Sequence, residues 1–171
     1  TIGFIHSKDI LIVDGNELNY LISNSDWETP YFIDVDSYQT KDFPATVIMP
    51  SIRDFCSTGF NKNTDWYSFG VLMFQLYTGI HPYKGTHPKY NITVDASGNE
   101  SKIDNVSERC KNKISVYNKE VKYPPFVKLD SIPSGLNDWF FSLFEKGERL
   151  PPPNVIVNLA PKPQITKVYG I

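Results

Sequence analysis

The chain has 171 residues, of which 40% are hydrophobic, 21% are charged and 14% are aromatic. This composition predicts one folded domain, or one lobe of a larger domain, and it excludes disordered, collagen-like and coiled-coil proteins. The formal net charge of −2 provides no basic surface, so we expect neither nucleic acid nor a membrane as a partner.

Neither the cysteines nor the apolar runs indicate a secreted or a membrane protein. Cys56 and Cys110 are far apart and stand in no CxxC motif, so the sequence predicts neither a disulfide framework nor a zinc site. No apolar run approaches the roughly 20 residues that span a bilayer. A reducing compartment, the cytoplasm, is therefore expected.

The first sixty residues predict short elements followed by a long loop. Residues 1–8 have the pattern of the end of a helix, and residues 20–23 and 31–35 have that of two strands joined in a small hairpin. Residues 37–63 hold no helical or strand period for more than a few positions. Ordered loops of this length tend to be functional.

A strongly apolar helix is predicted over residues 64–78, with Thr64 or Asn63 as its cap and Gly79 as its stop. Its apolar side chains are spread nearly all round the helix. This distribution predicts that the helix is buried at the centre of the fold.

The remainder of the chain alternates polar and apolar segments. Residues 81–106 are polar and predict an exposed loop, whereas residues 135–147 predict a second helix with one apolar face. Three prolines at 151–153 end any regular structure, and residues 154–171 are interpreted as an irregular tail or linker.

Polar residues next to the predicted hairpin indicate a cation site. Asp14 and Asn19 lie on the loop before its first strand, and Asp34 lies at the end of its second strand. Each residue alone is typical of a turn, but their order brings three oxygen ligands toward one point. Mg²⁺ prefers such ligands, which predicts a site for a magnesium ion that carries a nucleotide phosphate.

Three stretches of the chain together resemble the C-terminal lobe of the protein kinase family: His6–Asn19, Asp34–Asp36 and Asn63–Tyr83. The resemblance covers residues 1–153 and implies a mainly α fold with a small β-hairpin. Residues 10–19 are similar to the catalytic loop, whose family pattern is H-R-D-x-x-x-x-N. Residues 34–36 are similar to the D-F-G motif, residues 37–54 to the activation segment and residues 64–78 to the central helix.

The resemblance also implies roles for single residues in catalysis. Asp14 takes the place of the catalytic base, and Asn16 replaces the lysine of the catalytic loop. Asn19 and Asp34 take the places of the metal ligands, which implies Mg²⁺ and ATP as cofactors.

Other positions that the resemblance covers are structural. Asp65 takes the place of a carboxylate that holds the catalytic loop, so we expect it to accept backbone N–H groups from residues 12–14. Arg149 takes the place of a buried arginine, and Asp54 is the acid expected to pair with it. His6, at the end of the first helix, is expected to have a cap or helix-dipole role rather than a catalytic one.

Several positions depart from the family pattern. Val13 replaces the arginine that reads a phosphorylated activation loop, and Asn16 removes a positive charge from the transferring phosphoryl group. Ile12 and Val35 keep apolar bulk where the family stacks His and Phe, so this packing is expected to survive. Divergence of this extent resembles the atypical kinase-like proteins of bacteria and their phages more than the eukaryotic enzymes.

No glycine-rich loop, strand lysine or partner glutamate precedes Thr1, so we expect the N-terminal lobe to be a missing partner of this chain. The chain alone is then expected to be inactive, and the sequence names no protein substrate. Three functions stay open. They are Mg- and ATP-dependent phosphoryl transfer to Ser or Thr hydroxyls in the completed protein, a pseudokinase or scaffold module without catalysis, and a small-molecule phosphotransferase of the kinase-like superfamily.

Overall fold

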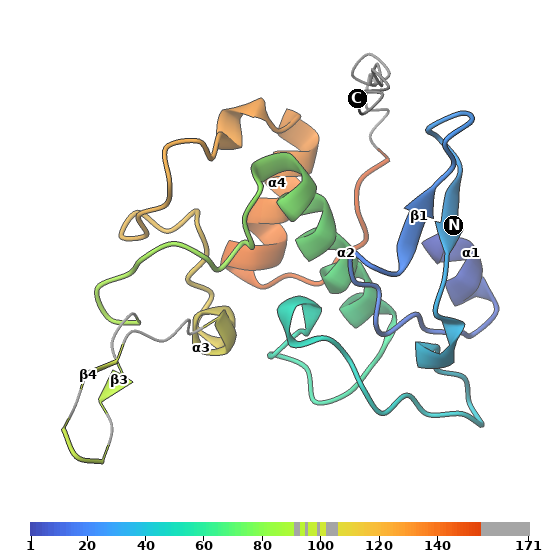
Figure 1. Cartoon of the computed structure of the whole chain (residues 1–171), viewed down its shortest axis with the longest axis horizontal. Coiled ribbons are helices and arrows are strands. Elements are labelled where there is room, and N and C mark those ends of the chain that lie inside the picture. The colour runs from blue at the N-terminus through green and yellow to red at the C-terminus, as the bar shows by residue number, and fades with distance from the viewer. Residues whose placement is uncertain (91–92, 95, 99, 102–105, 155–171) are drawn as a thin grey trace, which may run out of the picture.

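The computed structural model describes residues 1–90, 93–94, 96–98, 100–101 and 106–154 (Figure 1). The helices in this part of the chain are α1 (Ile2–Ser7), α2 (Lys62–Thr78), α3 (Val106–Lys111) and α4 (Ser134–Phe141), the last continued by the π-helical turn η4 (Ser142–Lys146). The strands are β1 (Tyr20–Ile22), β2 (Pro30–Phe32), β3 (Thr93–Val94) and β4 (Glu100–Ser101). Three short 3-10 turns are η1 (Val35–Ser37), η2 (Pro50–Ile52) and η3 (Leu129–Ser131).

Helix α2 is bounded by a cap at each end. The side chain of Asn61 accepts the backbone N–H of Thr64 at 3.2 Å, and the Thr64 hydroxyl accepts the N–H of Asn61 at 3.0 Å. At the other end Gly79 has φ +73°, and its N–H donates to the carbonyl of Gln75 at 2.8 Å. The helix therefore ends at the predicted glycine, but it begins at Lys62, two residues before the predicted start, because Asn61 and not Thr64 or Asn63 is the cap.

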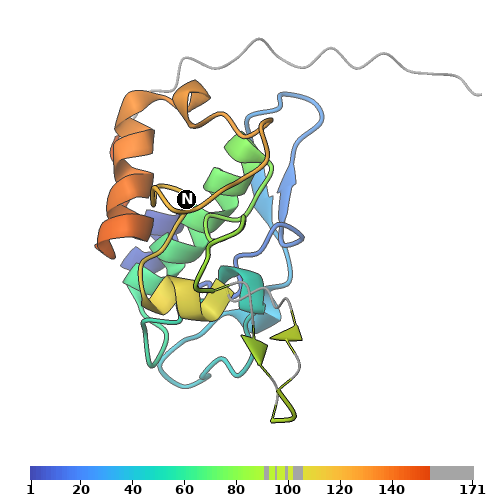
Figure 2. The same cartoon turned by 90° about the vertical axis from the view of Figure 1, so that its left-hand side faces the viewer.

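The core lies between α2 and α4, which run side by side in Figures 1 and 2. A Cβ at Gly70 would collide with Leu143 of η4 and would be in tight contact with Trp139 of α4, so this glycine lets the helices approach closely. Aromatic rings fill the space around this contact, and the fully buried ones are Tyr67, Phe74, Tyr83, Phe140 and Phe144. Burial of apolar rings such as these contributes strongly to the stability of a fold.

One face of α2 is open, contrary to the burial all round that the sequence predicted. Trp66, Met73 and Leu76 line a cavity of about 500 Å³ together with α1 and the β1–β2 hairpin. Leu76 is 71% exposed. Apolar composition alone did not reveal this, because it reports how apolar a helix is and not which neighbours cover it.

The predicted hairpin is present with shorter strands. β1 and β2 pair antiparallel with Tyr20 opposite Phe32, and the two rings make an edge-to-face contact with centroids 4.8 Å apart. The N–H of Ile33 extends the pairing by donating to the carbonyl of Asn19 at 3.1 Å. This extension joins the two segments in which the sequence predicts metal ligands.

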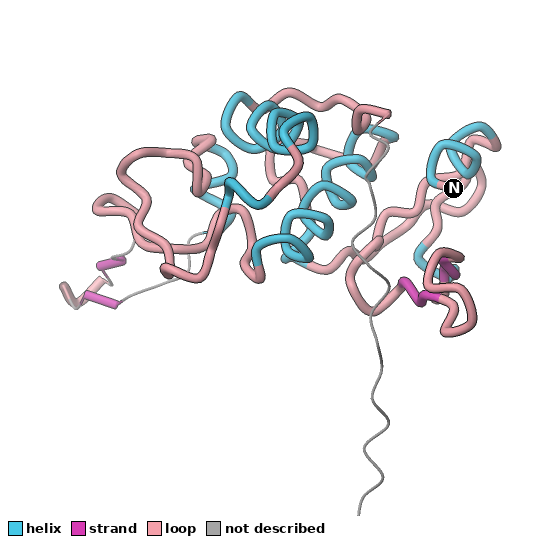
Figure 3. Tube along the Cα trace, turned by 90° about the horizontal axis from the view of Figure 1, so that it is seen from above, coloured by secondary structure: helices cyan, strands magenta, loops and turns pink. Residues whose placement is uncertain are grey.

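Two features between α2 and α4 were not predicted. Helix α3 and the two-stranded β3–β4 sheet lie in or next to residues 81–106, which the sequence predicted to be a loop. Each of these strands has two residues, too few for an alternating pattern. Figure 3 shows how much of the trace is loop around these short elements.

The predicted second helix is present as α4 and η4, and Gly147 with φ +76° follows its last turn. The predicted tail lies, from residue 155 onward, outside the described residues. Among the described residues, no helix is both long enough and apolar enough to cross a membrane.

Candidate functional site

The carboxylate of Asp65 on α2 holds the loop that follows α1. It accepts the backbone N–H of Ile12 at 2.8 Å and that of Val13 at 3.0 Å, as the sequence predicted. Asp65 is 4% exposed, and a carboxylate buried to this extent is tolerated only when it is hydrogen-bonded. Val13 has φ +62°, a strained conformation for a β-branched residue. The two hydrogen bonds therefore stabilise a loop shape that Val13 alone would not adopt.

His6, in the last turn of α1, completes this network. Its Nε2 lies 2.9 Å from an Asp65 carboxylate oxygen, and its ring meets Trp66 edge to face at 5.3 Å. His6 does lie in the last turn of α1, where the sequence placed it, but the bond of its side chain to Asp65 was not predicted. Because 59 residues separate His6 from Asp65, no local pattern could have indicated the contact.

The residues assigned to the catalytic loop lie together. One carboxylate oxygen of Asp14 accepts the side-chain amide of Asn16 at 3.1 Å, and the backbone carbonyl of Asp14 accepts the side-chain amide of Asn19 at 2.8 Å. The other carboxylate oxygen accepts the backbone N–H of Met49 at 2.8 Å. Asp14 is half-buried, whereas Asn16 and Asn19 are buried. Sequence reasoning missed Met49, which ties the long loop to this site.

The hydrogen bonds of the Asp14 carboxylate leave some of its lone pairs available. A carboxylate has about four lone-pair positions, and the side chain of Asp14 accepts one bond at each oxygen. The group can therefore accept a further hydroxyl proton while Asn16 and Met49 hold it in place.

Asp34 is connected to this cluster by a backbone hydrogen bond of its neighbour, Ile33. It follows Ile33, whose N–H donates to Asn19, and it is exposed and has φ +58°. The predicted convergence of the Asp34 side chain on Asp14 and Asn19 in one cleft stays a prediction. Val35 is 59% exposed while Ile12 is 3% exposed, so the expected packing between these two positions is not retained in this structure.

Asn19 and Asp34 each carry a side-chain oxygen of the kind that Mg²⁺ takes. The amide nitrogen of Asn19 is engaged by the backbone of Asp14, which leaves the oxygen of its side chain as the atom able to face a cation. Asp34 adds an exposed carboxylate. Mg²⁺ is commonly bound through one or two protein oxygens together with phosphate oxygens and water.

Arg149 and Asp54 form a two-bond ion pair, as the sequence predicted. Nε and Nη2 of Arg149 lie 2.7 and 2.9 Å from the two carboxylate oxygens, and the guanidinium lies 4.6 Å from the centre of the Tyr67 ring. The side chain of Arg149 is 15% exposed and that of Asp54 is 4% exposed. Burial alone would lower the pKa of Arg149, but the hydrogen bonds and the charge of Asp54 outweigh it and raise that pKa.

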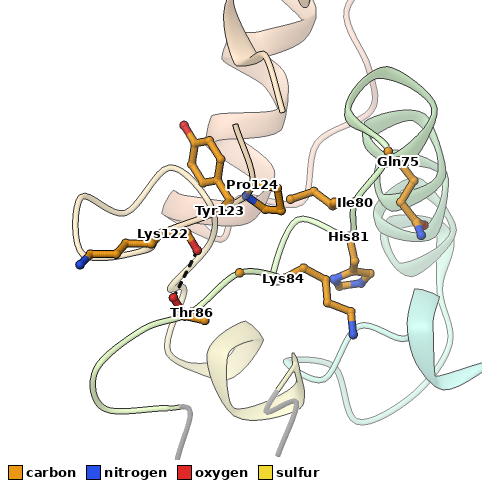
Figure 4. Close-up of a pocket in the computed structure, with 10 residues that line it drawn as sticks. Gln75, Ile80, His81, Lys84, Thr86, Lys122, Tyr123 and Pro124 are labelled. Atoms are coloured by element: carbon orange, nitrogen blue, oxygen red, sulfur yellow. Dashed lines mark hydrogen bonds between the residues drawn. The ribbon is translucent and has the colours of Figure 1, made fainter. Parts of the chain in front are cut away.

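A cavity of about 700 Å³ lies apart from these residues, at the end of α2 (Figure 4). Its wall includes Lys84 and His81 and a backbone bridge in which the N–H of Thr86 donates to Lys122 at 2.7 Å. The His81 ring lies 2.7 Å from the carbonyl of Ser51, and burial lowers its pKa to about 4. His81 is therefore neutral near pH 7 and joins two loops.

Comparison with known proteins gives one relevant similarity. No protein-family model matches the chain. Over 134 residues the chain is 26% identical to cAMP-dependent protein kinase type 3 of Saccharomyces cerevisiae, a match that covers 75% of the chain and 28% of the yeast protein. The chain thus spans little more than a quarter of this relative. The similarity gives the chain a kinase-related context, and nothing in it supports the expected likeness to bacterial and phage proteins.

Proposed function

We propose that the chain is the C-terminal lobe of a protein-kinase-like fold, and that the protein transfers a phosphoryl group from ATP to Ser or Thr hydroxyls when an N-terminal lobe completes the nucleotide site. The observation that carries the proposal is the pair of hydrogen bonds from Ile12 and Val13 to Asp65. These bonds hold the loop in which Asp14 and Asn19 are joined. The similarity to a yeast protein kinase supports the same function.

Each residue has a defined part in this mechanism. Asp14 takes the proton of the substrate hydroxyl, and Asn16 keeps the Asp14 carboxylate oriented through its 3.1 Å hydrogen bond. Asn19 and Asp34 would hold Mg²⁺, which when bound neutralises charge on the phosphate oxygens. Asn16 is neutral where the family has a lysine, so phosphoryl transfer is expected to be slow.

A specific observation favours the scaffold function as the second candidate. Both carboxylate oxygens of Asp14 already accept hydrogen bonds within the chain, from Asn16 and Met49. A carboxylate that is engaged in this way is a weaker base, because hydrogen bonding to the charged form favours that form. The third function open on the sequence, a small-molecule phosphotransferase, has no comparable observation in its favour.

The test separates nucleotide binding from transfer. The protein as encoded, with any residues that precede Thr1, is compared with Asp34→Ala and Asp14→Ala in a thermal shift with Mg-ATP and in transfer of labelled phosphate to a generic Ser/Thr substrate. Asp34→Ala is expected to lose the thermal shift. Asp14→Ala is expected to keep it and to lose about 10²-fold to 10⁴-fold of the transfer rate.

The matched control is Asp130→Ala, which removes an exposed aspartate outside the candidate site and should change neither measurement. Unchanged transfer by Asp14→Ala would contradict the proposed mechanism. Nucleotide binding without transfer by the unsubstituted protein would favour the scaffold function. The 171 residues alone are expected to show no thermal shift, because two oxygen ligands bind Mg²⁺ weakly.

A further inference from the structure

The structure brings the two cysteines together. Cys56 lies on the loop between η2 and α2, and Cys110 lies on α3, 54 residues further along the chain. The Sγ of Cys56 is 3.6 Å from the backbone carbonyl of Cys110. The two sulfur atoms and a carboxylate oxygen of Asp54 all lie within 4.8 Å of one another. No sequence pattern predicted this proximity.

We propose that Cys56 and Cys110 are a redox-active pair that closes to a disulfide when hydrogen peroxide oxidises Cys56. A disulfide requires the sulfur atoms to approach to about 2 Å. Cys56 is exposed and lies on a loop, so rotation of its side chain with a small shift of that loop brings its sulfur to Cys110. None of these contacts depends on the proposed function.

The chemistry takes two balanced steps. The Cys56 thiolate attacks one oxygen of hydrogen peroxide, the O–O bond breaks, and the second oxygen leaves as water after taking a proton, which makes Cys56 a sulfenic acid. The Cys110 sulfur then attacks the Cys56 sulfur, the S–O bond breaks, and the hydroxyl leaves as water with the Cys110 proton. The two thiols lose two electrons, and the peroxide is reduced to two waters.

The surroundings of the two sulfurs explain the order of these steps. Cys56 is exposed and can meet the oxidant, whereas Cys110 is 1% exposed. Burial raises the pKa of Cys110 to about 11, and the Tyr67 hydroxyl lies 3.2 Å from its sulfur. Cys110 therefore stays a protected thiol until an oxidised Cys56 reaches it.

A metal site at the same place is disfavoured by Asp54. Both of its carboxylate oxygens bind Arg149, and one of them also accepts the N–H of Cys56 at 3.0 Å. A divalent cation at the cluster would lie next to the guanidinium and would have to compete with it for this carboxylate. The cluster thus offers two thiols to a metal, fewer protein ligands than structural zinc sites use.

The experiment measures the disulfide equilibrium in the folded and the unfolded chain. The protein as encoded is equilibrated with reduced and oxidised glutathione in native buffer and in concentrated urea, and the linked peptides that contain Cys56 and Cys110 are quantified by mass spectrometry. If the native structure favours the disulfide, the equilibrium constant for its formation is expected to be at least about tenfold larger in native buffer than in urea, because a bond that the native state favours also stabilises that state. A constant no larger than that in urea would overturn the proposal.

Single-cysteine variants test the order of the steps under hydrogen peroxide. Cys56→Ser, a change at an exposed site, is expected to leave Cys110 reduced. Cys110→Ala is expected to accumulate a sulfenic acid at Cys56 that a dimedone probe traps, whereas the unsubstituted protein shows that adduct only briefly. Should Cys110→Ala fail to fold, alkylation of the unsubstituted native protein must label Cys56 well before Cys110. Equal labelling rates, or stoichiometric binding of Zn²⁺ by the reduced protein, would contradict the proposal.

Discussion

The buried carboxylate of Asp65 on α2 accepts a 3.0 Å hydrogen bond from the backbone N–H of Val13, a residue on the loop after α1 whose positive φ is strained. Neither partner is stable without the other. The carboxylate requires donors because it is out of water, and Val13 keeps its positive φ only where its surroundings hold it. This hydrogen bond links segments that are far apart in the sequence, and it stabilises the loop that carries the candidate site.

Removal of the Asp65 carboxylate is expected to destabilise the protein strongly. Asp65→Ala leaves the N–H groups of Ile12 and Val13 without an acceptor in a buried place, and the expected loss is about 3 kcal/mol in the free energy of unfolding. Urea unfolding measures this value. Asp130→Ala, at an exposed position, is the control and should stay within about 0.5 kcal/mol of the unsubstituted protein. A loss below about 1 kcal/mol for Asp65→Ala would count against the network.

The pair of Arg149 and Asp54 is expected to act as a unit. Arg149→Ala and Asp54→Ala should each cost about 3 kcal/mol, because each leaves a mostly buried charge unpaired. The double variant should cost less than the sum, with a coupling of about 1 to 3 kcal/mol in a cycle of urea unfolding curves. The exposed pair of Lys62 and Asp9, at 3.5 Å, is the control, with an expected coupling below about 0.5 kcal/mol. Additive costs for Arg149 and Asp54 would show that their contact does not stabilise the fold.

His81 is expected to make stability depend on pH. Burial lowers its pKa from 6.5 to about 4, so the unfolded chain binds the proton more readily than the folded protein. The contribution is therefore fully present above about pH 6.5 and is lost as the pH falls toward 4, with a total of about 3 kcal/mol. His81→Gln should flatten this part of the profile, measured by urea unfolding at a series of pH values. Identical pH profiles for the two proteins would rule out His81 as the source.

Two glycine substitutions are expected to have opposite effects. Gly79 has φ +73°, and an added Cβ would lie 3.6 Å from Phe126, which is ordinary contact. Gly79→Ala should therefore lower the free energy of unfolding by about 1 kcal/mol because of backbone strain and not because of a clash. Gly3 lies within α1 and has no atom within 4 Å of an added Cβ, so Gly3→Ala should stabilise by about 0.5 to 1 kcal/mol. Thermal unfolding of both variants checks the signs. Shifts in the same direction would contradict this account of the two positions.

The elements that could be predicted are those whose signals are local. Helix α2 has a long apolar run with a glycine stop, and the hairpin has two short β-forming segments around a polar turn. The start of α2 was misplaced because Asn61, Asn63 and Thr64 can each cap a helix, and the backbone geometry of Asn61 decides among them. The π-helical continuation of α4 and the two-residue strands β3 and β4 leave no periodic signal.

Local sequence patterns were enough to predict the central apolar helix and the hairpin and to single out Asp14, Asn19 and Asp34, because each of these signals depends on neighbours within a few positions. The contacts of His6 with Asp65, of Met49 with Asp14 and of Cys56 with Cys110 could be seen in the folded chain alone. These contacts join segments that are 35 to 59 residues apart. Such contacts form only when the packing of the whole chain outweighs the entropy lost in closing the loops between them, and no local pattern records that balance.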